Sequence, residues 1–196
     1  MGKSKHSKSA ASDGKKSAAP FLQIRTSFYL PLSPCAYRYA LDGLCAEHLS
    51  PHVLQYYPPL HGVLLSYTNL SLSQQPPRGT TTDSSDEDES VLCKSINEYG
   101  VSFVWLTGDF TIFRPEKGTT LEGDVNLQSE SVLGLMCYNY FNASVDRDSV
   151  PEDWTWDGEH WLRNGKSVSG RVSFKVVDFE PSGDGAISIT GSLKEV

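Results

Sequence analysis

The stretch FTIFRPEKGTTLEGDVNL, residues 110–127, joins two strands of different character. Its first residues form an apolar, β-rich run, and from Leu121 to Leu127 apolar and polar residues alternate with the period of two that is typical of a half-buried strand. Between them, Pro115 cannot donate to a sheet and Gly118 relaxes the backbone, so one strand should end and another begin after a tight turn. We predict an interdomain hinge at Arg114, Pro115 and Gly118. A Pro115→Gly substitution should then loosen the angle between two folded domains.

The half of the chain after this hinge is nearly all β. Alternating or apolar segments predict five strands, at residues 121–127, 132–137, 141–145, 172–176 and 187–193. A loop over residues 146–165 holds three tryptophans and separates the third strand from the fourth. Five short strands of this kind are typical of a small closed barrel, which has no free sheet edges. We therefore predict an all-β, five-stranded OB-type domain over residues 115–196.

The half before the hinge mixes strands and helices. Strands are expected at Ser27–Leu32, at residues 61–72 and from Val101 onward, where a bulge or a hairpin turn at Gly108 interrupts the alternation. Two short helices are expected between the first two strands. The first covers residues 36–46, and the second starts at the N-cap Ser50 and ends at Pro58. The sequence thus predicts an α+β N-terminal domain, residues 21–114, with a helical pair on a small sheet.

Two segments lack the apolar residues needed for a core. Residues 1–20 carry five Lys and one Asp and predict a disordered basic tail. Residues 73–92 predict a disordered loop with five acids between positions 83 and 89. Ser84, Ser85 and Ser90 are candidates for phosphorylation by an acid-directed kinase, although a solvated spacer is the simpler interpretation.

The charge, the apolar runs and the cysteines of the chain argue against several classes of protein. The formal net charge is -7, and residues 115–196 carry seven Lys or Arg against fourteen Asp or Glu, which disfavours tight nucleic-acid binding. The chain has no apolar run of membrane-spanning length and no secretory signal, so we expect an intracellular protein with no membrane partner. The four cysteines at 35, 45, 93 and 137 form no C-x-x-C pair, which argues against a zinc site and disulfides.

The sequence contains no complete catalytic pattern. Gly165-Lys166-Ser167 ends like a phosphate-binding loop but lacks the preceding glycine. His48 and His52 are four residues apart, as in a zinc helix, but Pro51 breaks their shared turn. No nucleophile motif is present. We predict a protein that is not an enzyme, with no catalytic residues, cofactor or metal.

The combination and order of several motifs, each weak alone, resembles a known family. They are residues 27–32, the helix start EHLSP at 47–51, the strand LHGVLLSY at 60–67, FRPEKG at 113–118 with LEG at 121–123, NASV at 142–145, VPEDW at 150–154 and GEHW at 158–161. Together they resemble the larger stalk subunit of multisubunit RNA polymerases, and they are most similar to its RNA polymerase I version.

The resemblance implies a non-catalytic subunit with an N-terminal tip domain and a C-terminal OB barrel. Its implied partners are a smaller stalk subunit, the polymerase I core and the initiation factor used at ribosomal RNA genes, in the nucleus and nucleolus. The core-docking candidates form one segment: Tyr57, Pro58, Pro59, Leu60, His61 and Gly62.

A barrel of this type can also bind single-stranded RNA by stacking bases on aromatic side chains beside a basic groove. The candidates for this contact are Tyr138, Tyr140, Arg147, Lys166, Arg171 and Lys175. Because acids outnumber bases in this half, we expect weak contact with nascent RNA at most. Two alternatives remain open: a free-standing RNA-binding module, and a stalk subunit of RNA polymerase II or III.

Overall fold

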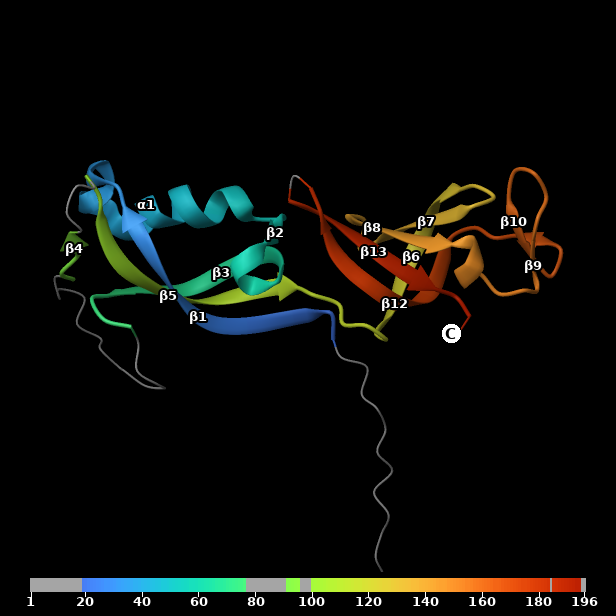
Figure 1. Cartoon of the computed structure of the whole chain (residues 1–196), viewed down its shortest axis with the longest axis horizontal. Coiled ribbons are helices and arrows are strands. Elements are labelled where there is room, and N and C mark those ends of the chain that lie inside the picture. Colours follow the sequence, from blue (N-terminus) through green and yellow to red (C-terminus); the bar gives the residue numbers. More distant parts are fainter. Residues whose placement is uncertain (1–18, 77–90, 96–99, 184, 195–196) are drawn as a thin grey trace, which may run out of the picture.

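A computed structural model describes residues 19–76, 91–95, 100–183 and 185–194. Its helices and strands form two units placed end to end along the long axis of the molecule, a sheet with a helical run on one side and a β-barrel (Figure 1). Nearly all of the predicted basic tail lies outside the described residues. So do most of the predicted acidic loop and its candidate phosphorylation sites Ser84, Ser85 and Ser90.

The N-terminal unit is built on an antiparallel sheet with the strand order β1-β5-β3-β2. These strands are β1 Phe21–Leu32, β5 Ser102–Phe113, β3 Gly62–Ser73 and β2 Tyr56–Tyr57, and the short β4 Lys94–Ser95 also pairs with β5. β1 pairs with β5 without a register shift from Phe21↔Phe113 to Leu32↔Ser102. The strand predicted at residues 27–32 is therefore only the last half of β1.

The irregularity predicted near Gly108 lies in the neighbouring strand instead. β5 runs through Gly108 as one strand against β1, whereas β3 shifts register twice against β5, between Leu64 and Ser66 and between Thr68 and Ser71. A side chain at position 108 would collide with Leu70, so the glycine makes room for this bulged part of β3. The alternation breaks in β5 because its neighbour is bulged.

The predicted pair of helices is one irregular helical run. It consists of the 3-10 segment η1 Pro34–Tyr39, the α-helix α1 Ala40–Leu44, the π-helical η2 Cys45–Leu49 and the 3-10 turn η3 Ser50–His52. The hydroxyl of Ser50 does not cap a new helix but shares a hydrogen bond of 2.9 Å with the Tyr67 hydroxyl. Beyond His52 the chain turns back and Tyr56–Tyr57 pairs with Gly62–Val63, so sheet pairing replaces the expected second helix.

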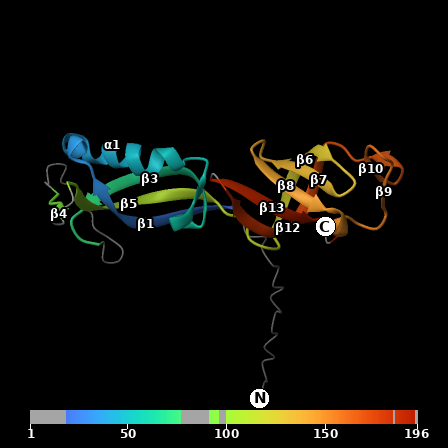
Figure 2. The same cartoon turned by 45° about the horizontal axis from the view of Figure 1, so that its top comes forward.

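The helical run covers one face of the sheet (Figure 2). The core between them contains Leu32, Leu44, Leu49, Tyr57, Leu60, Leu64, Val104, Leu106, Phe110 and Ile112. In β1 and β5 these are even-numbered residues, as expected for strands whose side chains alternate between the two faces.

The C-terminal unit is a closed five-stranded barrel with the order β12-β13-β8-β7-β6, which confirms the OB-type domain. Its strands are β6 Thr120–Gln128, β7 Val132–Cys137, β8 Phe141–Asp146, β12 Arg171–Ser182 and β13 Ala186–Ser192. A parallel pairing of β13 with β8 closes the barrel, and its other pairs are antiparallel. All five strands overlap the segments predicted for them, although β12 continues beyond residue 176 to Ser182.

The tryptophan-rich segment expected as a loop contains a small sheet. After the 3-10 turn η5 Arg147–Ser149, the strands β9 Trp154–Trp156, β10 Trp161–Arg163 and β11 Lys166–Ser167 pair in the order β11-β10-β9. This tryptophan sheet lies at the end of the barrel away from the N-terminal unit (Figure 1).

Candidate interaction surfaces

The two units meet around Phe113, the last residue of β5. Its side chain has no exposed surface, and its ring stacks on Phe141 of β8 with centroids 4.0 Å apart and planes 5° from parallel. Rings of the two units surround this pair: Phe21, Tyr138 and Phe179 lie 5.4, 6.0 and 6.2 Å from the Phe113 centroid. Phe113 and Val63 therefore belong to the hydrophobic core of the barrel, although their strands belong to the N-terminal sheet.

Polar contacts add to this aromatic junction. The backbone N–H of Tyr56 donates to the carbonyl of Gly185, in the turn between β12 and β13, at 2.7 Å. The Tyr140 hydroxyl donates to the carbonyl of Leu54 at 3.1 Å. Gly185 has a positive φ of 75°, and a side chain there would press on Gln55. The turn at one end of the barrel is thus fitted against the N-terminal unit.

The predicted hinge residues lie directly beside this junction. The N–H of Arg114 donates to the carbonyl of Pro20 at 2.8 Å, and the N–H of Gly118 donates to the carbonyl of Val176 at 2.7 Å. Pro115 is buried, and Gly118 has a φ of 86° that favours glycine. The segment is held at both ends, so whether it acts as a hinge remains a prediction.

The predicted docking segment is partly core. Tyr57, Leu60 and Gly62 are buried, whereas Pro58, Pro59 and His61 are exposed. Pro58–Leu60 forms the 3-10 turn η4, and His61 follows it with a left-handed φ of 50°. The turn therefore exposes three side chains to solvent, while the other three residues of the segment are buried beneath them.

The basic candidates for RNA contact are spread over the barrel, and two of them pair with acids. Arg147 bonds Glu130 at 2.8 Å, and Arg171 lies 3.6 Å from Asp124. Lys166 is exposed on β11, and Lys175 lies on β12.

The aromatic candidates Tyr138 and Tyr140 lie at the junction. Each is 52% exposed, but the Tyr138 ring packs edge-on against Phe21 at 5.0 Å and Tyr140 bonds Leu54. Burial raises the pKa of Tyr138, with smaller contributions from Cys137 and Glu122. Each keeps some exposed surface for other contacts.

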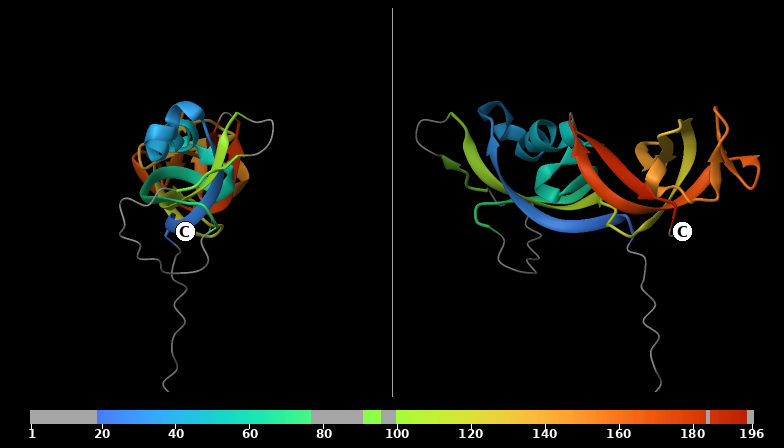
Figure 3. Two further views of the ribbon diagram at one scale, coloured as in Figure 1. Left: turned by 90° about the vertical axis from the view of Figure 1, so that its left-hand side faces the viewer. Right: turned by 45° about the vertical axis from the view of Figure 1, so that its right-hand side comes forward.

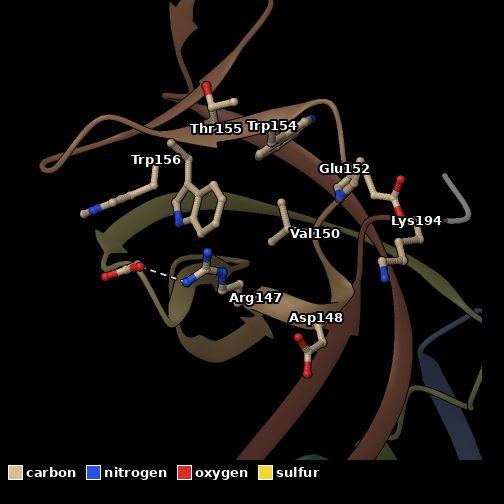
Figure 4. Close-up of a pocket in the computed structure, with 11 residues that line it drawn as sticks. Arg147, Asp148, Val150, Glu152, Trp154, Thr155, Trp156 and Lys194 are labelled. Carbon is tan, nitrogen blue, oxygen red and sulfur yellow. Dashed lines mark hydrogen bonds and ion pairs between the residues drawn. The ribbon is translucent and has the colours of Figure 1, made fainter.

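An open groove of about 710 Å³ lies between the barrel and the tryptophan sheet (Figure 4). Val150 and Trp156 face it together with charged side chains of both signs, among them Arg147, Asp148 and Lys194. Trp154 and Trp161 also line it but are only 8% and 4% exposed. The sequence did not predict this groove, because it depends on strands of two or three residues, which are too short to show a period.

Gln128 of β6 attaches the tryptophan sheet to the barrel. Its amide Nε2 donates to the carbonyl of Val168 at 2.9 Å, and its Oε1 accepts from the N–H of Trp161 at 2.8 Å. The indole N–H of Trp161 donates to the carbonyl of Ser129 at 2.9 Å. These bonds fix one wall of the groove.

The motifs considered for catalysis or metal binding have local structural contacts. His48 Nε2 lies 2.9 Å from the Pro31 carbonyl, and the His52 ring lies 5.1 Å from that of Tyr57. Gly165 is in the turn between β10 and β11, with a φ of 74°. Among the residues that the structure describes, no three His, Cys, Asp or Glu side chains are placed to hold a metal ion. Within the same ranges, every helix is too short or too polar to span a membrane.

Comparison with known sequences gives consistent matches. The family model described as the RPA43 OB domain in RNA Pol I matches residues 115–165. DNA-directed RNA polymerase I subunit rpa43 of Schizosaccharomyces pombe is 32% identical over 126 residues, which are 64% of this chain and 63% of that protein.

The RPA43 subunits of Mus musculus and Homo sapiens are 29% and 27% identical over 147 and 165 residues. These residues are 75% and 84% of this chain but only 38% and 42% of the two proteins. The chain thus spans less than two thirds of the length of the relatives it matches. By these matches the chain is similar to the RPA43 subunits of RNA polymerase I, most clearly in the OB domain at residues 115–165.

Proposed function

We propose that the chain is a non-catalytic stalk subunit of RNA polymerase I, which pairs with a smaller stalk subunit and docks on the core enzyme in the nucleus. The observation that carries the proposal is the match of the RPA43 OB domain to residues 115–165, which include three of the five barrel strands and most of the tryptophan sheet. In the finer part of the proposal, the subunit supports recruitment of the initiation factor for ribosomal RNA transcription in the nucleolus.

The docking segment is part of this proposal. The contact with the core enzyme is made by the exposed Pro58, Pro59 and His61. The turn is held in place by the buried Tyr57, Leu60 and Gly62. Two prolines limit the backbone freedom of the turn, so little conformational entropy is lost on binding.

Protein contact is favoured over a free-standing RNA-binding module. The predicted stacking residues lie at the junction between the units, and two of the predicted phosphate partners already pair with carboxylates. Both features reduce the surface available for a strand of RNA. Contact with nascent RNA remains the weaker part of the proposal.

The test is purification of the tagged chain from cells, followed by mass spectrometry. We expect large RNA polymerase I subunits and one small partner. A Pro59→Glu variant should lose core subunits, because it places a charge in the docking turn, and a Lys166→Glu variant on β11 serves as the control. Recovery of RNA without any polymerase subunit would overturn the proposal in favour of the RNA-binding module.

A further inference from the structure

The groove between the barrel and the tryptophan sheet lies at the free end of the molecule. In Figure 3 the sheet formed by β9 and β10 stands at the end of the barrel farthest from the N-terminal unit. The described residues that line the groove all belong to the C-terminal unit, from Glu130 to Lys194. A partner can therefore enter it without disturbing the docking segment or the junction between the units.

The interior of the groove is apolar and aromatic. Figure 4 shows Val150 between Trp156 at one end of the groove and Glu152 and Lys194 at the other. The Trp156 ring packs on Trp161 with centroids 5.6 Å apart, yet Trp156 is only partly buried. A tryptophan ring that stays accessible beside a valine is a surface that a large apolar side chain can cover.

Hydrogen bonds hold both walls of the groove in place. The N–H of Val150 donates to the carbonyl of Arg147 at 3.1 Å, and the N–H of Leu193 donates to the carbonyl of Ser149 at 2.9 Å. The bonds of Gln128 described above hold the tryptophan sheet against the barrel. Because the groove is already formed, little conformational entropy is lost when it binds a ligand.

The charges around the groove are mostly negative. Residues 146–160, which form one side of it, contain six Asp or Glu and one Arg. That arginine, Arg147, is already paired with Glu130 at 2.8 Å. Within the described ranges, the lining carboxylates of Asp148 and Glu152 form no ion pair. They are available to a positively charged group, which the acidic surroundings also attract at long range.

This charge pattern favours a protein segment over a nucleic acid. Phosphate groups would be repelled by Asp148, Glu152 and the acidic surroundings, and in the described part of the chain Lys194 is the one lining base outside an ion pair. A basic peptide meets complementary charge instead. The Lys194 ammonium group can donate to backbone carbonyls of such a peptide.

We propose that this groove binds an extended segment of a partner protein in which a Lys or Arg lies close to a large apolar residue. The apolar side chain covers Val150 and Trp156, and the basic side chain reaches Asp148 and Glu152. The site goes beyond the proposed function, because it uses neither the docking segment nor the contact with the smaller stalk subunit.

Three short peptides added to the full chain test the proposal. The first alternates Leu and Lys, the second Leu and Glu, and the third Ser and Lys. The indole N–H signal of Trp156 in NMR spectra reports binding in the groove, and that of Trp105 on β5 is the reference. We expect the Leu/Lys peptide to bind at least about tenfold more tightly than the other two and to shift the Trp156 signal alone.

The other possible results of this titration each contradict the proposal. Equal binding of the Ser/Lys peptide would show that charge attraction alone is at work. Tighter binding of the Leu/Glu peptide would indicate an acidic partner. A single-stranded RNA that displaces the Leu/Lys peptide from Trp156 would show that the groove binds nucleic acid.

Two double variants supply a second readout. The first, Asp148→Asn with Glu152→Gln, removes both lining carboxylates and keeps the shapes of the side chains. The second, Asp153→Asn with Glu159→Gln, makes the same change in charge at exposed residues of the same segment that do not line the groove. We expect the first to weaken binding of the Leu/Lys peptide by about fivefold and the second by less than about twofold. Equal losses in the two variants would overturn the proposal.

Discussion

At the scale of single residues, Cys137 shows how burial in the barrel alters ordinary chemistry. It lies on β7 with no exposed surface, and burial, with a smaller contribution from Asp124, raises the pKa of its thiol from 9.0 to about 11. Between these values the unfolded chain loses the proton and the folded chain keeps it. Stability should therefore fall as the pH rises from 9 to 11.

A Cys137→Ala variant should lack this part of the alkaline decline, although it is less stable at every pH because of the cavity. The difference in the free energy of unfolding between this variant and the unsubstituted chain should narrow by about 1.4 kcal/mol per pH unit between pH 9 and 11. Urea unfolding at pH 8 to 10.5 measures it. A Cys35→Ala variant, which removes an exposed thiol, is the control and should run parallel to the unsubstituted chain. A constant difference between Cys137→Ala and the unsubstituted chain would contradict the prediction.

At the scale of elements, the tryptophan sheet depends on Gln128. A Gln128→Glu substitution keeps the shape of the side chain but loses the donor that bonds the Val168 carbonyl. We expect a loss of about 1–3 kcal/mol in the local opening free energy of β10 and β11, because an acceptor is left without its partner. Hydrogen exchange at the amides of Trp161 and Val168 measures this.

The amides of β7 and β8 should be unaffected by the substitution, because the barrel strands bond one another. Gln23→Glu, at an exposed residue of β1 whose side chain forms no hydrogen bond with the residues that the structure describes, is the matched control. Faster exchange throughout the barrel would show that Gln128 supports the whole domain rather than the attached sheet.

The elements also show what the sequence could predict. The barrel strands were predicted because four of them alternate apolar and polar residues over five or more positions and the remaining one, Val132–Cys137, is an apolar run. The second helix was predicted wrongly because Ser50 and Pro51 form a good local start signal, while the pairing of Tyr56–Tyr57 with β3 depends on residues further along the chain. The first half of β1 was missed because its polar residues pair across strands, as Arg25 does with Asp109 at 3.1 Å.

The candidate site was harder to predict than the fold. The docking segment was predicted from its motif, but which of its residues face solvent depends on η4, which the sequence did not indicate. Tyr138 and Tyr140 look like stacking residues in sequence, and only the fold places them beside Phe21 and Leu54. The spacing of residues along a strand predicts which face of the sheet a side chain occupies, but not which other element packs against that side chain.

At the scale of the whole molecule, we expect the ring stack at Phe113, rather than the proline beside it, to set the angle between the two units. Pro115→Gly leaves the Phe113–Phe141 stack and the bond from Tyr56 to Gly185 in place, so we expect small-angle scattering to show an unchanged shape. Phe113→Ala removes a fully buried ring at a cost of about 3–5 kcal/mol and should broaden the distribution of interdomain angles.

If the alanine variant does not fold, Phe113→Leu keeps a buried apolar group and loses only the stacking, and it should show the same broadening to a smaller extent. Phe103→Leu is the matched control, because its ring stacks on Tyr29 at 5.2 Å, away from the junction, and its loss should leave the scattering unchanged. If Pro115→Gly changed the shape and neither Phe113 variant did, the prediction would be wrong. Residues 114–118 would then determine the angle between the two units. If the chain is a stalk subunit as proposed, two units that move together would carry the position of the docked end to the barrel, so the Phe113 variants should also weaken any contact that needs both units at once.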